Sequence, residues 1–172
     1  VAYQELMPFD FTELGVDEGS DCDTTMLTGG YPPLFDQPVA HHDWFSNYIR
    51  TYIERDVRQI RGITDLIKFE RFVRLCAGRI GQLLNISALA SETGIDNKTA
   101  ESWIAVLEAS FVVFRLQTHH RNFNKRLVKM QKLYFVDTGL ATHLLGIRDA
   151  EVLRWSPFRG ALFENQTITE LR

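Results

Sequence analysis

The sequence predicts a mainly α-helical chain with a winged helix-turn-helix at its centre and a small β-ribbon as the wing. Three observations predict this fold. Apolar residues recur at helical spacing from Asp43 onward. Two short helical patterns flank Gly94. Two strings rich in aromatic and β-branched residues, FVVFRLQ and KLYFVDTG, then follow as predicted strands.

The composition is that of a globular protein. The chain has 172 residues, of which 45% are hydrophobic and 24% are charged, and those fractions argue against wholesale disorder. No apolar run approaches the roughly 18 residues that a membrane span needs. The start of the chain also lacks a secretory pattern, so we expect no membrane partner. Cys22 and Cys76 form neither a metal-binding spacing nor a disulfide framework, and a cytoplasmic location is expected.

Charge divides the chain into two parts. Residues 1–49 hold nine acids and no Lys or Arg, whereas residues 50–172 hold 13 acids and all 19 basic residues. The second part, with its net charge of +6, is suited to facing nucleic acid, and the first part is not. The alternative is that both parts are ordinary solvent-exposed surfaces without a binding role. Composition alone favours this alternative.

Residues 1–42 are predicted to be rich in loops. The string LMPFDFTEL predicts a short helix over 9–14, and the next stretch concentrates Gly, Pro, Asp and Ser, which predicts loops and turns. A long loop inside a compact domain is usually functional, flexible or a sign of missing chain. We therefore expect the chain to begin partway through a larger protein.

Residues 43–84 are predicted to form a helical, lid-like linker. Asp43 is the expected N-cap of a first helix, and Gly62 is expected to end that helix. Thr64 is the expected cap of a second helix that runs to about Gly78 with its apolar face inward.

Residues 85–137 carry the helix-turn-helix pattern. Ser87 and Asp96 are the expected caps of its two helices, and Gly94 lies at the tight turn between them. Small residues are needed where the two helices touch, and Ala90 and Ala100 stand at those positions. The two strands and the loop between them complete the order of a winged helix.

A polar helix start and a basic loop form the predicted DNA-binding surface. Helix-turn-helix proteins read DNA with the start of their second helix, and basic wing residues contact phosphates. The candidate residues are Asn97, Lys98, Thr99, Ser102, Arg121, Lys125, Arg126, Lys129 and Lys132. No acid occurs from Arg115 to Lys132. Winged helices also dock onto proteins, and Lys98 is the one basic residue at the predicted helix start. The hypothesis that this winged helix is a protein-docking module therefore stays open.

Other polar motifs form no recognisable active site. TGGYPP lacks the Gly-Lys-Ser/Thr of a phosphate-binding loop and is interpreted as a rigid turn. The pairs His41–His42 and His119–His120 lack the spacing and the company of metal ligands, and are interpreted as surface residues.

Two acids lie near the last helices, which are expected over 138–145 and, after a loop, from GALFEN onward. Asp137 ends a strand and precedes a helix, so it is suited to capping that helix. Glu164 is either a surface residue or a pairing partner for Arg159. Two acids without a third ligand do not make a metal site.

Several strings taken together resemble a known family. They are LMPFDFTEL, GGYP, YIRTYIERDVRQI, the stretch from FERFVRLCAGRI to FVVFRL, KRLVKMQKLYFVDTGLATHLLG and GALFENQTITEL. In this order they resemble the C-terminal half of prokaryotic AAA-type P-loop ATPases whose tail is catalogued as a domain of unknown function. The resemblance covers nearly the whole chain.

The resemblance implies parts that this chain lacks. A core that binds ATP and Mg²⁺ would precede it, residues 1–42 would be the exit from that core, and the chain itself would hold no cofactor. Residues 138–172 would begin a further α/β domain, a truncated restriction-endonuclease-like region in which Glu164 matches the first acid and Asp137 is a second acid carried over. Arg55 would act as an arginine finger on a neighbour's γ-phosphate. Ion pairing among its charged neighbours is the structural alternative.

We therefore expect a non-catalytic region of an AAA-type ATP-binding protein that binds duplex DNA through its winged helix. The expected partners are double-stranded DNA and the protein's own ATPase domain. The alternative is a docking or homo-oligomerisation module of the same ATPase, marked by an exposed apolar patch at Trp103 or over 44–48. A nuclease-related enzyme is a third hypothesis, which rests on Asp137 and Glu164 alone.

Overall fold

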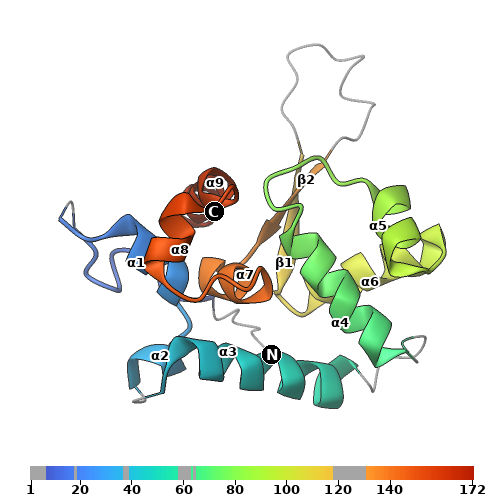
Figure 1. The fold of residues 1–172 in the computed structure, drawn as a ribbon, viewed down its shortest axis with the longest axis horizontal. Coiled ribbons are helices and arrows are strands. Elements are labelled where there is room, and N and C mark those ends of the chain that lie inside the picture. Colours follow the sequence, from blue (N-terminus) through green and yellow to red (C-terminus); the bar gives the residue numbers. More distant parts are fainter. Residues whose placement is uncertain (1–6, 18, 37–38, 58–62, 64, 118–130) are drawn as a thin grey trace, which may run out of the picture. The chain divides into compact units, whose positions relative to one another are not determined.

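A computed structural model of the chain describes residues 7–17, 19–36, 39–57, 63, 65–117 and 131–172. Within these residues the chain is mainly helical, with one small antiparallel sheet of two strands (Figure 1). The mainly helical class and the β-ribbon predicted from the sequence are thus confirmed. None of the described helices has both the length and the apolar character that crossing a membrane requires.

The chain forms two compact units. The first comprises Val1–Ser46 and Val136–Arg172, and the second comprises Asn47–Phe135. The predicted segments 1–42 and 138–172 therefore belong to one unit, although they lie at opposite ends of the sequence.

Helices build the first unit. They are α1 (Cys22–Thr28), α2 (Pro33–Asp36), the first half of α3 (His41–Thr51), α7 (Thr138–Leu144), α8 (Ala150–Trp155) and α9 (Arg159–Glu170). In Figure 1, α1 lies beside α8, and it also packs against α7 and α9. The close approach of α1 to α7 depends on Gly139, because a Cβ there would lie 2.6 Å from the carbonyl oxygen of Thr28. Met26, Leu140 and Leu162 are buried in this core.

Three helices lie where the sequence predicts loop, namely α1, α2 and α8. α1 is short and rich in Asp and Thr, so it has no apolar period that would reveal it. Burial of Asp23 and Met26 supports this helix through tertiary contacts. The helix predicted over 9–14 is wrong, because residues 11–15 form turns instead. Its single backbone bond from Leu14 N–H to the Asp10 carbonyl (3.0 Å) is not propagated.

The second unit combines helices with the sheet. After the end of α3 come α4 (Leu66–Ala77), α5 (Ile86–Thr93), α6 (Asn97–Ala109), β1 (Val113–Gln117) and β2 (Gln131–Phe135). α3 continues into a π-helical turn, Tyr52–Asp56, and its predicted end at Gly62 lies outside the described residues. The two strands are antiparallel, with Val113 opposite Phe135.

Aromatic side chains join α4 to α6. The ring of Trp103 lies 5.2 Å from that of Phe69 and 5.4 Å from that of Phe72, both close to edge-to-face. All three side chains are buried, and rings of this size contribute on the order of 2–3 kcal/mol each when removed from water. Trp103 belongs to this core, so the exposed apolar patch predicted there is wrong. The helical period places it on the same inward face as Ala100 and Leu107.

Three helix starts differ from those that the sequence predicts. Asn85 caps α5 in place of Ser87, and its side chain accepts a hydrogen bond from Ala88 N–H. Asp65 caps α4, whereas the predicted cap, Thr64, lies outside the described residues. α3 begins two residues before Asp43, which lies in its first turn. Asn, Asp, Ser and Thr are all good caps, so the sequence locates a helix start only to within one or two residues.

Candidate functional site

The turn between α5 and α6 has the geometry that the sequence predicts. Gly94 is left-handed, with φ +76° and ψ 44°, and its N–H donates to the carbonyl of Ala90 at 2.9 Å. A Cβ at Gly94 would meet nothing within 4 Å, so the backbone conformation and not the available space selects glycine. Ala90 and Ala100 are buried, and α5 packs against α6.

The start of α6 presents polar side chains. Asp96 caps the helix by accepting from Thr99 N–H at 2.9 Å, and its second oxygen accepts from the Thr99 hydroxyl at 2.6 Å. These hydrogen bonds from Thr99 lower the pKa of the Asp96 carboxyl. Thr99 is thereby held in the cap and is half-buried, whereas Asn97, Lys98 and Ser102 are exposed. Asn97 also donates to the hydroxyl of Ser87 at 3.2 Å.

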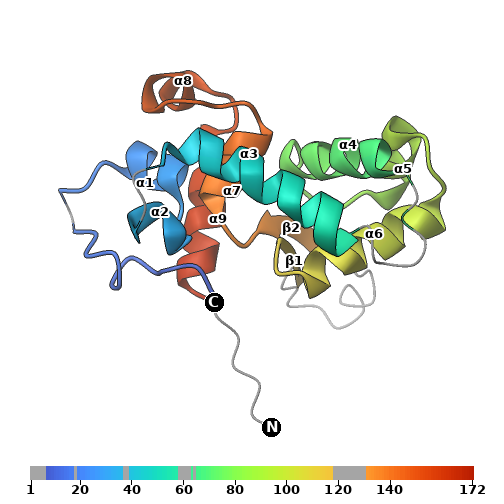
Figure 2. The ribbon, with the colours of Figure 1, turned by 90° about the horizontal axis from the view of Figure 1, so that it is seen from below.

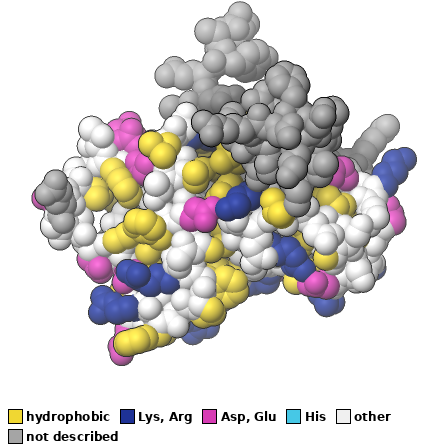
Figure 3. All heavy atoms as spheres, turned by 90° about the horizontal axis from the view of Figure 1, so that it is seen from above, with side chains coloured by type: hydrophobic (Ala, Val, Ile, Leu, Met, Phe, Trp, Pro, Cys, Tyr) yellow, Lys and Arg dark blue, Asp and Glu magenta, His cyan; other side chains and the backbone are white. Residues whose placement is uncertain are grey.

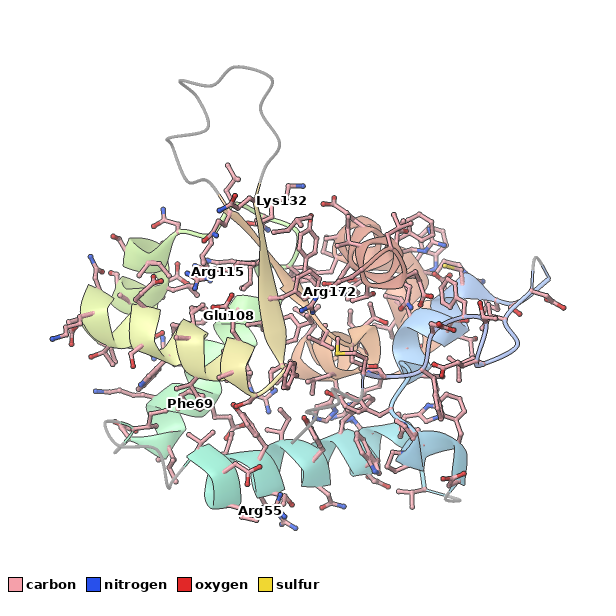
Figure 4. All side chains as sticks on the ribbon, turned by 180° about the vertical axis from the view of Figure 1, so that it is seen from behind. Arg55, Phe69, Glu108, Arg115, Lys132 and Arg172 are labelled. Atoms are coloured by element: carbon pink, nitrogen blue, oxygen red, sulfur yellow. The ribbon has the colours of Figure 1, made fainter. Side chains whose placement is uncertain are left out.

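An arginine on β1 pairs with two acids of α6, an arrangement that sequence reasoning missed. Arg115 donates to both oxygens of Glu108, at 2.9 and 2.6 Å, and to Glu101 at 2.7 Å. Figure 4 labels Arg115 and Glu108, whose side chains point toward each other between strand and helix. The hydrogen bond that Arg115 donates to Glu108 is the main cause that raises the pKa of Arg115. The sequence hides this cluster because its members come from different elements.

The ribbon contributes one described candidate residue. Lys132 on β2 lies opposite Leu116 of β1, and Leu83 forms an isolated bridge to it from its other side. Lys132 lies next to the last pair of the ribbon, Gln117 and Gln131, at the end where residues 118–130 connect the two strands (Figure 4). Arg121, Lys125, Arg126 and Lys129 lie outside the described residues.

Charges of both signs cover the described surface. On the face shown in Figure 3, Lys and Arg side chains are interspersed with Asp and Glu side chains. Because the charges are mixed, a surface that binds a polyanion has to be a small region in which basic side chains predominate.

Arg55 lies in the π-helical turn. It is exposed and its Nε donates to Asp56 at 2.8 Å, and Figure 4 shows it at the outer edge of the helix. An exposed pair of this kind contributes little to stability, on the order of 0–1 kcal/mol. Its role as an arginine finger stays a prediction.

Asp137 is a buried cap. Its side chain accepts from Leu140 N–H and from Gly30 N–H, each at 2.7 Å. Burial raises the pKa of this carboxyl to about 6, against the opposing effect of its backbone hydrogen bonds. Gly29 has φ +72°, and a Cβ there would lie 2.4 Å from the carboxylate. Gly29 and Gly30, the glycine pair of TGGYPP, therefore pack against the side chain of Asp137.

The other acid, Glu164, is half-buried on α9. Arg159, considered as its partner, donates to the buried Asp23 of α1 at 2.7 Å, and Arg154 approaches the same carboxylate at 3.4 Å. Among the described residues, no group of three or more His, Cys, Asp or Glu side chains is arranged to hold a metal ion.

Comparison with known proteins identifies the family. Residues 19–151 match the model of a family described as a domain of unknown function, DUF8612. The chain belongs to this family. Two relatives, both uncharacterized proteins, come from Mycobacterium bovis and Mycobacterium tuberculosis, and each is 32% identical over 158 residues. The match covers 90% of this chain but 36% of each relative, so the chain spans about a third of their length. No solved structure matches.

Proposed function

We propose that this DUF8612 chain binds duplex DNA through a winged helix formed by α4, α5, α6, β1 and β2. The observation that carries the proposal is the order and pairing of these elements. A short extended segment between α4 and α5 pairs with β2, since Leu84 N–H donates to Gln131 at 2.7 Å and Leu133 N–H donates to Gln82 at 3.1 Å. Helix, edge segment, two helices and a hairpin follow one another as in winged helix-turn-helix proteins.

The start of α6 has the chemistry to meet DNA. Asn97, Lys98 and Ser102 are exposed there and offer amide, ammonium and hydroxyl donors to base edges and phosphates. Carboxylates nearby would repel a phosphate backbone. Arg115 pairs with both Glu101 and Glu108 and offsets one of their two negative charges, so the face of α6 is less acidic than its sequence suggests.

The loop that joins the two strands supports the same proposal by its composition. Residues 118–130 contain Arg121, Lys125, Arg126 and Lys129 and no acid. In a winged helix such a loop contacts the DNA backbone beside the reading helix, and each phosphate contact adds affinity that is lost in salt.

Charge reversal at α6 tests the proposal. Lys98→Glu should weaken binding of a fluorescently labelled random-sequence duplex by at least about tenfold, since it replaces an attraction to phosphate with a repulsion. Arg50→Glu is the matched control, because Arg50 is also an exposed helical residue of the second unit but lies at the end of α3. Fluorescence anisotropy measures both affinities. Equal losses for the two variants would contradict the proposal.

A second variant tests the loop. Simultaneous replacement of Lys125, Arg126 and Lys129 by glutamate should abolish duplex binding and leave the circular dichroism spectrum and the unfolding midpoint unchanged. Retained binding with an intact fold would remove the loop from the proposed interface.

Docking onto protein is the second candidate function. Leu83 and Leu116 lie on either side of Lys132 and are 44% and 41% exposed, and exposed apolar side chains are a feature of protein interfaces. If this function holds, Leu83→Ser with Leu116→Ser should abolish self-association or docking, measured by light scattering, and DNA should not bind at low salt.

We also propose that the chain is the non-catalytic region of a longer ATP-binding protein. The support is the resemblance of its strings to AAA-type ATPases and the greater length of its mycobacterial relatives. In that setting its partners would be DNA and the ATPase part of the same protein. Measurement of ATP hydrolysis by the full-length mycobacterial relative tests this. No hydrolysis with or without DNA would contradict it.

A further inference from the structure

A pocket in the first unit lies outside the proposed DNA-binding surface. It has a volume of about 260 Å³ and is enclosed by the start of α3, by α7, by Leu27 of α1 and by the residues that follow α7. Leu27, Phe45 and Ile147 contribute apolar walls. The nitrogen-bearing side chains of the lining are His41, His42, His143 and Arg148. We refer to it as the histidine pocket.

We propose that the histidine pocket binds a small organic anion, with a carboxylate or a phosphate carried on a flat apolar body. Its walls are built for a flat group. The rings of His42 and His143 lie 4.8 Å apart, and the ring of Phe45 lies 5.8 Å from that of His143. These rings touch one another and form a continuous aromatic wall, and planar ligands pack against such a wall through apolar contact and stacking.

Positive charge at the rim selects an anion. Arg148 is exposed there and offers the planar fork of donors that matches a carboxylate or a phosphate. α3 has 11 residues and begins at His41, so its first N–H groups and its dipole add positive potential at the same place.

Two carboxylates lie next to the pocket residues in the sequence and oppose this charge. Asp149 follows Arg148, but its side chain accepts from Val152 N–H at 2.8 Å as the cap of α8. Asp43 follows His42 in the first turn of α3 and is exposed to solvent, which screens it. A metal ion is a poorer fit than an anion, because the described residues hold no group of His, Cys, Asp or Glu arranged for one.

Ligand titrations monitored by NMR test the proposal on the whole chain. Benzoate and phenyl phosphate should shift the imidazole resonances of His41, His42 and His143 saturably, with dissociation constants of about 1 mM or below, as expected for fragments of this size. The anion that binds with the higher affinity shows whether the pocket prefers a carboxylate or a phosphate. Benzyl alcohol has a similar flat body without charge and should bind at least about tenfold more weakly. Absence of saturable shifts with both anions would overturn the proposal, as would equal binding of the alcohol.

Two variants test whether Arg148 supplies the positive charge that binds the anion. Arg148→Gln should weaken anion binding at least about fivefold, whereas Arg50→Gln, which removes a charge from the far end of α3, should leave it unchanged. Equal losses for the two variants would overturn the proposal. Lys98→Glu should have no effect, so failure of this proposal and failure of DNA binding are distinguishable.

Discussion

At the scale of the residue, Asp137 explains the glycine pair of the string TGGYPP. Its carboxylate satisfies the N–H of Leu140 at the start of α7 and the N–H of Gly30 in the preceding loop. Gly29 leaves room for that carboxylate, since any Cβ there would collide with it. The string TGGYPP therefore has a structural reason for its glycine pair, which is the burial of a charged cap.

Asp137→Asn should destabilise the protein by about 2–4 kcal/mol, measured by urea unfolding. The amide offers one acceptor oxygen where the carboxylate offers two, so one buried N–H loses its partner. Asp149→Asn is the matched control, because Asp149 caps α8 through one exposed hydrogen bond and Asn is an equally good cap. Equal effects in the two variants would contradict this account of Asp137.

The pH dependence of stability should carry the signature of Asp137. Burial raises its pKa to about 6 from the ordinary value of 3.8. The native state then holds a proton that the unfolded state releases, so the contribution of Asp137 to stability is full below about pH 4 and is lost as the pH rises through about 6. The free-energy difference between wild type and Asp137→Asn should therefore grow as the pH falls from about 7 to 4.5. A constant difference across this range would refute the assignment.

Gly94→Ala should lower stability by about 1–2 kcal/mol, because a left-handed residue with a Cβ is strained even where space is free. Gly78→Ala is the control, since Gly78 has an ordinary φ of −65° and its Cβ would make contacts of 3.5 Å or longer. Thermal unfolding of both variants measures the difference. A similar change in both would show that the turn does not require glycine.

At the scale of the element, Arg115 joins β1 to α6. Its hydrogen bonds to Glu101 and Glu108 fix the helix against the strand, and its charge offsets one of the two negative charges on the proposed DNA-reading helix. The Arg115 side chain therefore both holds the helix against the strand and reduces the negative charge of the helix surface.

Arg115→Gln should lower stability by about 1–3 kcal/mol and weaken duplex binding, because it leaves two carboxylates without their counter-charge. A triple variant that adds Glu101→Gln and Glu108→Gln should recover duplex affinity, since the exposed negative charge is gone. Urea unfolding and fluorescence anisotropy measure the two effects separately. If affinity stays low in the triple variant with an intact fold, charge neutralisation is not the role of Arg115 in binding.

Helices with a clear apolar period were predictable from the sequence, and α4, α6, α7 and α9 lie close to where the pattern places them. α1 was not predictable, because a short helix of Asp and Thr is stabilised by tertiary contacts such as Asp23 with Arg159. The helix-turn-helix residues could be named from local spacing. The Arg115 cluster and the histidine pocket could not, because their members come together only when distant segments fold.

At the scale of the whole molecule, net charge is a poor guide to binding. The chain carries a net charge of −3, yet its 19 basic residues all lie beyond residue 49. The second unit, whose sequence includes residues 118–130, thus holds most of the positive charge that a polyanion would meet. A duplex bound there would be held mainly by phosphate contacts, which release counterions and make affinity depend steeply on salt.

The salt dependence of duplex binding tests the central claim most directly. We expect fluorescence anisotropy to give micromolar affinity at about 50 mM salt and a large loss by about 200 mM, with a log–log slope near −0.9 for each phosphate contacted. A slope of about −3 or steeper would correspond to three or more such contacts. Affinity that does not change with salt, or no binding at the lower salt concentration, would contradict a DNA-binding winged helix and favour the docking module.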